Sequence, residues 1–227
     1  MHYERKLDFP DDWFEQETAF CKDNGKYYPA VKFKISANVW WKRFIGYSGN
    51  HKANFLGAYK GMNWSPPGMK VNEGDQIWIT EGIFNAGSLY QNGIKAIACL
   101  SCNNIPTKFI ETHKEMGIIW VLGLDNDPIN KNTGKNAGLE ATKNFRRHLI
   151  DLGENVKITF THTNKDWNDI HRKDGINEET IEKSFWRGKL MTAKNEVARN
   201  RNSDPIVEIF WREYKHHLRD LSSLLLQ

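Results

Sequence analysis

Cysteine is scarce in this sequence, and a long apolar run is absent. The three cysteines, Cys21, Cys99 and Cys102, include no second Cys or Cys/His pair that would complete a zinc site, so we interpret them as reduced thiols. No stretch approaches the roughly 18 uninterrupted apolar residues of a membrane span, and the first residues lack the apolar core of a secretory signal. We therefore expect a cytoplasmic protein without a membrane partner.

Acidic residues are almost missing between residues 22 and 72, where nine lysines and arginines accompany the single Asp23. Aromatic residues are interleaved with these cations, a mixture typical of surfaces that neutralise phosphates and stack bases. We therefore predict a nucleic-acid-binding surface. Its candidate cations are Lys32, Lys34, Lys42, Arg43, Lys52 and Lys60. The alternative is a solvated sheet whose aromatic residues face its own core.

The pattern of the chain changes near residue 74. Before this point, short strand-like runs separated by Gly, Asn and Ser predict a small basic, β-rich (α+β) subdomain over residues 1–73. Over residues 74–175, strand and helix patterns alternate in the order β-α-β-α-β-α-β. This order predicts an α/β fold with an open, mainly parallel sheet flanked by helices.

The last region, residues 176–227, has helical patterns. One helix is expected to begin near Asn177, and an amphipathic helix is expected over residues 204–227. The second of these is able to pack on the sheet or to dock a partner, such as a helicase or another copy of the chain. The sequence does not choose between these two possibilities.

Acidic residues follow three of the predicted strands at their carboxyl ends. In chain order they are Glu81, Asp125, Asp127, Asp166 and Asp169. Ligands of open parallel sheets bind outside the carboxyl ends of the strands, so three loops would bring these carboxylates to one crevice. Two carboxylates about 4 Å apart repel by about 4 kcal/mol at an effective dielectric constant near 20, so the group requires protonation, separation or a cation.

An all-oxygen site of this kind suits Mg²⁺ or Mn²⁺. Together with a bound polynucleotide, it predicts phosphoryl transfer or phosphodiester hydrolysis. Two simpler interpretations stay open: Glu81 and Asp125 as solvated residues at strand ends, and Asp166 as the cap of a short following helix.

The order of these motifs resembles the Toprim domain shared by bacterial primases, topoisomerases and several nucleases. The resemblance consists of Glu-Gly after the first strand, Asp-x-Asp after the third, and the late acidic motif "KDWND". That last motif is similar to one in Toprim proteins encoded by plasmids, phages and conjugative elements. The resemblance extends toward primases, because "YYPAVKFKISANVWWKRFIGYSG" stands where primases have a segment of the form FPI…GxxxGFxGR.

The resemblance implies roles for the acidic residues. Asp125 and Asp127 match the aspartate pair that coordinates the metal, and Glu81 matches a glutamate that acts as a metal ligand or as a general acid/base. Asp166 or Asp169 would supply a further metal ligand.

The same resemblance places Lys42 and Arg43 in a stretch that contacts template or nucleotide in primases. Gly82 would permit a tight turn that brings backbone N–H groups near the site. One departure concerns Asn85, which stands where primases usually have an aspartate. An amide oxygen can still coordinate a metal, but it contributes no negative charge.

These observations predict a primase-like nucleotidyltransferase core from a mobile genetic element, phage or plasmid. It would bind single-stranded DNA and nucleotides and synthesise a short primer with Mg²⁺ or Mn²⁺. A Toprim nuclease that uses the same carboxylates is an alternative. A non-catalytic replication accessory module is another, favoured by Asn85 and by the lack of a visible zinc-binding module.

Overall fold

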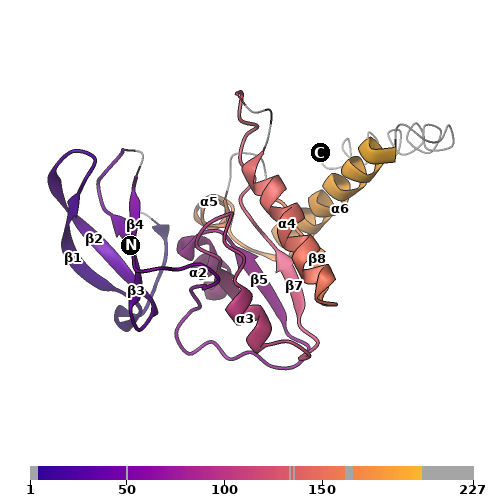
Figure 1. Cartoon of the computed structure of the whole chain (residues 1–227), viewed down its shortest axis with the longest axis horizontal. Coiled ribbons are helices and arrows are strands. Elements are labelled where there is room, and N and C mark those ends of the chain that lie inside the picture. Colours follow the sequence, from indigo (N-terminus) through magenta and orange to yellow (C-terminus); the bar gives the residue numbers. More distant parts are fainter. Residues whose placement is uncertain (1–4, 50, 133, 135, 162–165, 201–227) are drawn as a thin grey trace.

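The computed structural model describes residues 5–49, 51–132, 134, 136–161 and 166–200. Figure 1 shows an antiparallel sheet on the left and, beside it, a parallel sheet surrounded by helices. The α/β fold class predicted from the sequence is confirmed, including the β-rich part that precedes the parallel sheet. The helix expected over residues 204–227 lies outside the described residues.

The antiparallel sheet follows a short 3-10 helix, η1 (Asp11–Trp13). Its strands, in the spatial order in which they pair, are β1 (Glu15–Cys21), β2 (Lys26–Ser36), β3 (Val39–Phe44) and β4 (Ala53–Leu56). The sequence predicted β2, β3 and β4 but not β1. One acidic residue of β1, Glu15, lies opposite a basic residue of β2, Lys32.

The parallel sheet has the spatial order β6-β5-β7-β8. Its strands are β5 (Gln76–Thr80), β6 (Ala96–Ala98), β7 (Ile119–Leu122) and β8 (Asn155–Ile158). After β5 the chain continues to β6 on one side, whereas β7 continues to β8 on the other side. The connections therefore diverge at the carboxyl ends of β5 and β7, where open α/β sheets have a crevice.

The helices lie between these strands and after them. They are α2 (Ile83–Gln91), α3 (Thr107–Thr112), α4 (Ala137–Asp151), α5 (Trp167–Lys173) and α6 (Glu178–Asn200). Gly93 and Gly153 follow α2 and α4 with φ of 79° and 77°, a backbone conformation that favours glycine. Among the described residues, no helix has the length and apolar character needed to cross a membrane.

Aromatic residues join the two sheets into one core. Phe84 of α2 packs edge-on against Phe33 of β2 and Trp41 of β3, with ring centroids 6.0 and 5.6 Å apart. Trp64, which is 2% exposed, lies in the same cluster and forms a bridge to Ala98 at the end of β6. The antiparallel sheet is thereby held against α2, the helix that begins directly after Glu81 and Gly82.

Candidate active site

Glu81 lies at the carboxyl end of β5, one residue beyond the strand. Its backbone carbonyl accepts a hydrogen bond from Leu100 N (2.9 Å), which fixes the strand end to the loop after β6. Burial raises the pKa of the Glu81 carboxyl, and the negative charge of Asp127 raises it further, while a hydrogen bond from the Cys102 backbone acts in the opposite sense. Cys99 and Cys102 are free thiols beside it, as the sequence predicted.

Asp125 lies three residues after the end of β7, the strand that pairs with β5. Burial, followed by the negative charges of four other acids, raises the pKa of Asp125 to about 8. These acids are Glu81, Asp166, Asp127 and Asp169. The structure therefore brings together the carboxylates that the sequence placed at three strand ends.

Asn136 holds the loop that carries Asp127. Its side-chain oxygen accepts from Leu139 N (2.8 Å) and so caps α4. Its amide nitrogen donates to the backbone carbonyl of Asp127 and to the side chain of Asn126. Asp127 itself is exposed, so its carboxylate is available to a ligand that approaches from solvent.

Asn85 lies in the first turn of α2 and is buried. Its Nδ2 donates to Asp125 Oδ1 (2.8 Å), and its Oδ1 accepts from the backbone N–H of Asn168 (3.1 Å). A backbone N–H is always a donor, which fixes the orientation of the amide. The oxygen that would coordinate a metal is thus directed to α5, and the amide orients the Asp125 carboxylate instead.

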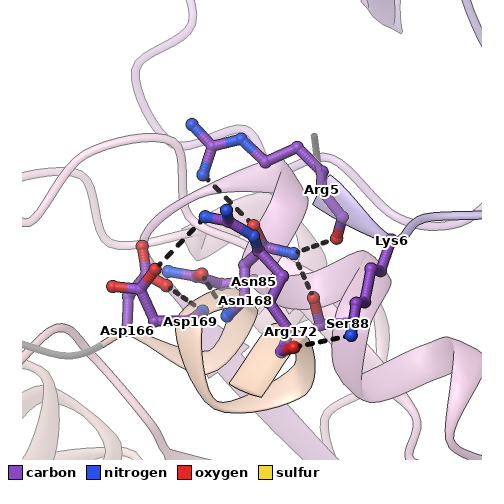
Figure 2. Close-up of polar contacts among 8 residues, drawn as sticks. All are labelled: Arg5, Lys6, Asn85, Ser88, Asp166, Asn168, Asp169 and Arg172. Carbon is purple, nitrogen blue, oxygen red and sulfur yellow. Dashed lines mark hydrogen bonds and ion pairs between the residues drawn. The ribbon is translucent and has the colours of Figure 1, made fainter. Parts of the chain in front are cut away.

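Asp166 caps the short helix α5, because its Oδ1 accepts from Asp169 N (2.7 Å). Burial raises the pKa of Asp166, whereas the nearby Arg5 guanidinium lowers it. Asp169 is half-buried and lies 3.7 Å from the Arg172 guanidinium. Figure 2 shows both carboxylates on the same side of α5. Trp167 between them is fully buried and donates to the Gly123 carbonyl (3.0 Å), so it acts as a packing anchor.

A metal fits the chemistry of this group of residues. Burying several acids together without a cation is unfavourable, which the raised pKa of Asp125 records. The donors are oxygen atoms, the type that Mg²⁺ and Mn²⁺ prefer. Within the described part of the chain, no three His, Cys, Asp or Glu side chains are arranged to hold an ion by themselves. An ion here would need water or substrate oxygens as well.

The predicted cations lie in different places. Lys32 forms ion pairs with Glu15 (2.7 Å) and Glu17 (3.6 Å), and Lys42 also pairs with Glu17. Because Lys32 and Lys42 lie opposite each other in the register, they share one face of the sheet. This outer face is opposite to the one that carries Phe33 against α2, so these two lysines are directed away from α2.

Lys34 lies two residues after Lys32 in β2, so it shares the outer face, where it is exposed and lies over the Trp40 ring (5.8 Å). Arg43 is adjacent to Lys42 in β3, so it lies on the opposite face, which packs against α2. Lys52 is exposed. Lys60 is exposed as well, and its neighbour Gly61 accepts from Lys108 N and donates to Asn104. Lys60 therefore lies beside the loop that follows β6, on the same edge of the sheet as Glu81.

Gly82 is the N-cap of α2 and has φ −104°, an extended conformation that does not require glycine. A Cβ atom there would meet no atom closer than 3.9 Å. The expected tight turn is therefore an ordinary helix start. Its position beside Glu81 still places the N-terminus of α2 at the carboxyl edge of the sheet.

Sequence reasoning missed Gly138, in the first turn of α4. A Cβ atom at this position would lie 1.8 Å from the Asp125 carbonyl oxygen, so only glycine lets the helix approach that closely. It also missed Arg5 and Asn168, because their contact joins residues 163 positions apart. No local pattern in the sequence signals such a contact.

A separate cavity of about 210 Å³ lies between α4, β8 and α6, with Arg146, Ile158 and Met191 among its lining residues. None of the predicted site residues lines it. The carboxyl edge of the parallel sheet is therefore the candidate active site.

The buried acids predict how stability depends on pH. An unperturbed aspartate titrates near pH 4, whereas Asp125 in the folded protein does so at about 8. Between these values the folded state retains a proton that the unfolded chain has lost, so the free energy of unfolding falls as pH rises. We expect the urea midpoint of the protein in EDTA to be lower at pH 8 than at pH 6. Asp125→Asn should reduce this difference, and an unchanged difference in the variant would contradict the assignment.

Comparison with known proteins identifies the class of this domain. Residues 76–177 match the family model of the Toprim domain. That segment begins with β5 and contains each of the acidic residues described above, so the parallel sheet and its acidic edge form a Toprim domain. Toprim domains generally bind divalent metal ions. No curated protein matches the chain.

Two crystal structures share the fold over most of the chain. One contains the zinc-binding and RNA polymerase domains of the Aquifex aeolicus primase (16% identity, TM-score 0.52, 91% of this chain and 51% of that chain). The other is the RNA polymerase domain of the Mycobacterium tuberculosis primase DnaG (13% identity, TM-score 0.51, 88% and 74%). The chain thus contains a segment that matches the Toprim domain, its fold resembles that of primase cores, and it spans about half the length of the Aquifex chain.

Proposed function

We propose that this chain is the core of a primase-like nucleotidyltransferase, which joins nucleotides into a short primer on single-stranded DNA. The observation that carries the proposal is the position of Glu81 and Asp125 at the diverging ends of β5 and β7, beside a β-rich part packed on α2. The primase-like fold of the whole arrangement supports the same activity.

Asp125 and Asp127, with Glu81, would hold Mg²⁺ or Mn²⁺, which when bound offsets charge on the attacking and leaving oxygens. Asn85 and Asn168 keep the Asp125 carboxylate in place through the hydrogen bonds described above. In the alternative role, without contact to the ion, Glu81 is suited to accept the proton of an attacking hydroxyl, because its pKa is raised and it lies at the edge of the crevice.

The test is nucleotide incorporation by the purified chain on a single-stranded template, with Mg²⁺ or Mn²⁺ and with ribonucleotides or deoxyribonucleotides. Metal-dependent extension that is lost in Glu81→Gln would support the proposal. Cleavage of the template without nucleotides would indicate a Toprim nuclease instead. Template binding without either reaction would indicate an accessory module.

Single-stranded DNA is proposed to reach the site past Lys60. We expect Lys60→Gln to weaken binding of a single-stranded oligonucleotide about threefold and to lower the salt slope by about 0.7, the value for one lost phosphate contact. Lys42→Gln should have a smaller effect, because Lys42 is already paired with Glu17. The dissociation constants of both variants and their salt slopes can be measured by fluorescence anisotropy at several salt concentrations. A larger effect of Lys42→Gln would place the DNA on the outer face of the antiparallel sheet.

A further inference from the structure

The first described residues form a strap across α2 and α5. This N-terminal strap, residues 5–9, crosses α2 and α5 and hydrogen-bonds to both. Asp8 N donates to Gln91 Oε1 (3.0 Å) on α2, and Lys6 Nζ donates to the Arg172 carbonyl (2.8 Å) on α5. The strap is therefore attached to the two helices that border the acidic site.

Apolar contacts hold the strap in place. Leu7 is 2% exposed, and Phe9 packs among the core residues beneath the antiparallel sheet. A Cβ atom at Gly87 of α2 would lie 2.1 Å from the Phe9 ring, so the ring rests directly on the helix backbone. This anchoring fixes the position of Arg5, a few residues away.

Arg5 and Asn168 bind each other through two hydrogen bonds. The Arg5 guanidinium donates to Asn168 Oδ1 (3.1 Å), and Asn168 Nδ2 donates to the Arg5 carbonyl (2.9 Å). Asn168 is fully buried, and its backbone N–H binds Asn85, which in turn binds Asp125. A continuous chain of hydrogen bonds therefore connects the strap to the Asp125 carboxylate. Figure 2 shows the part of this chain that runs from Arg5 through Asn168 to Asn85.

The guanidinium has more donors than this contact uses. Arginine carries five N–H donors in a planar fork, a geometry that matches phosphate. In Figure 2 one edge of the fork faces Asn168, and the other edge points away from the residues drawn. The charge of Arg5 also acts on Asp166, which places it within electrostatic reach of the acidic site.

A phosphate-bearing substrate needs positive charge beside this acidic site. Lys32 and Lys42, which the sequence predicted to bind nucleic acid, lie on the outer face of the antiparallel sheet and are paired with acids of β1. Arg5 by contrast is tied to the hydrogen-bonded chain that ends at Asp125. Its position and its fork geometry both suit an oxyanion next to a metal-binding carboxylate.

We infer that Arg5 binds a phosphate of the incoming nucleoside triphosphate, and that the strap exists to hold this guanidinium beside the carboxylates. The inference rests on the proposed function, since it assigns the triphosphate to the same site. Asn168 is then a positioning residue, because it orients the guanidinium through its buried amide.

The test measures binding rather than turnover. Calorimetric titration of the full chain with Mn²⁺ alone, and then with inorganic triphosphate at saturating Mn²⁺, gives two separate dissociation constants. We expect Arg5→Gln to weaken triphosphate binding about tenfold or more, the typical loss for a charge-assisted hydrogen bond, and to leave the Mn²⁺ constant within about twofold. Lys22→Gln is the matched control, because Lys22 is exposed in the turn after β1, outside the strap.

The outcomes separate the inference from the proposed function. If wild-type protein binds Mn²⁺ and triphosphate, and Arg5→Gln and Lys22→Gln are equally affected or both unaffected, the role of Arg5 alone is overturned. Wild-type protein that binds neither probe would overturn the proposed function and the inference together. If Arg5→Gln lowers the unfolding temperature, Arg5→Lys tests the contact instead, because lysine retains the charge without the planar fork. We expect the triphosphate affinity of Arg5→Lys to lie between those of wild type and Arg5→Gln. If Arg5→Lys bound triphosphate as tightly as wild type does, the contact between the planar Arg5 fork and the phosphate would be overturned.

Discussion

Asp125→Asn is expected to reduce metal-dependent nucleotide incorporation at least about 100-fold, because the central carboxylate loses the negative charge that would hold the ion. The same substitution should not unfold the protein. The amide keeps an oxygen for the Asn85 hydrogen bond (2.8 Å) and removes a buried carboxyl that is costly to ionise. Incorporation on a single-stranded template and calorimetric Mn²⁺ titration measure the loss.

The matched control for this prediction is Asp151→Asn. Asp151 is exposed at the end of α4 and has the same chemical change without the buried surroundings. Incorporation and Mn²⁺ affinity should stay at the wild-type level. If Asp125→Asn retained both properties, the assignment of the carboxyl edge as a metal site would be wrong.

Gly138→Ala is expected to destabilise the protein by about 1–3 kcal/mol, the usual cost of overpacking, and to weaken Mn²⁺ binding. Helix propensity alone predicts the opposite, a gain of about 1 kcal/mol when alanine replaces glycine within a helix. The clash makes the net change in stability unfavourable, because the new Cβ would lie 1.8 Å from the Asp125 carbonyl oxygen, a backbone atom that cannot rotate away. Urea unfolding and Mn²⁺ titration measure the two effects.

Gly82→Ala is the stability control for this prediction. It makes the same change at the same edge of the sheet, but its Cβ would meet nothing closer than 3.9 Å. We expect its free energy of unfolding to stay within about 1 kcal/mol of wild type, as for an ordinary N-cap position. Equal losses in Gly82→Ala and Gly138→Ala would show that close approach to Asp125 is not the cause.

The parallel sheet and its acidic edge were predictable because local signals agreed with one another. β5 and β7 read as apolar runs, glycine followed α2 and α4, and a general rule about strand ends placed Glu81 beside Asp125. A rule of this kind needs only the order of the elements, so it does not depend on side-chain detail.

The strand β1 could not be predicted for a physical reason. Its large apolar residue, Phe20, is 48% exposed, whereas the residues that it buries are the small Ala19 and Cys21. Its acids are stabilised by Lys32 of β2 and Lys42 of β3 rather than by solvent alone. Alternation of hydrophobic and polar residues, the usual signal of a strand, is therefore weak here.

Asn85 shows a second limit of the sequence. From its residue type, the Asn85 side-chain oxygen was predicted to be able to bind a metal. In the structure that oxygen accepts a hydrogen bond from the backbone of α5. The orientation depends on Asn168, which lies 83 positions away. The partners of a buried amide come from the tertiary fold, and motif spacing does not contain them.

The strap also constrains the order in which the parts of the molecule fold. Arg5 is synthesised before Asn168, its partner, which follows 163 positions later in the chain. Closing so large a loop is entropically costly and requires α2 and α5 to be docked first. The strap therefore docks only after α5 has been synthesised, so a nascent chain lacks a complete site until translation has passed α5.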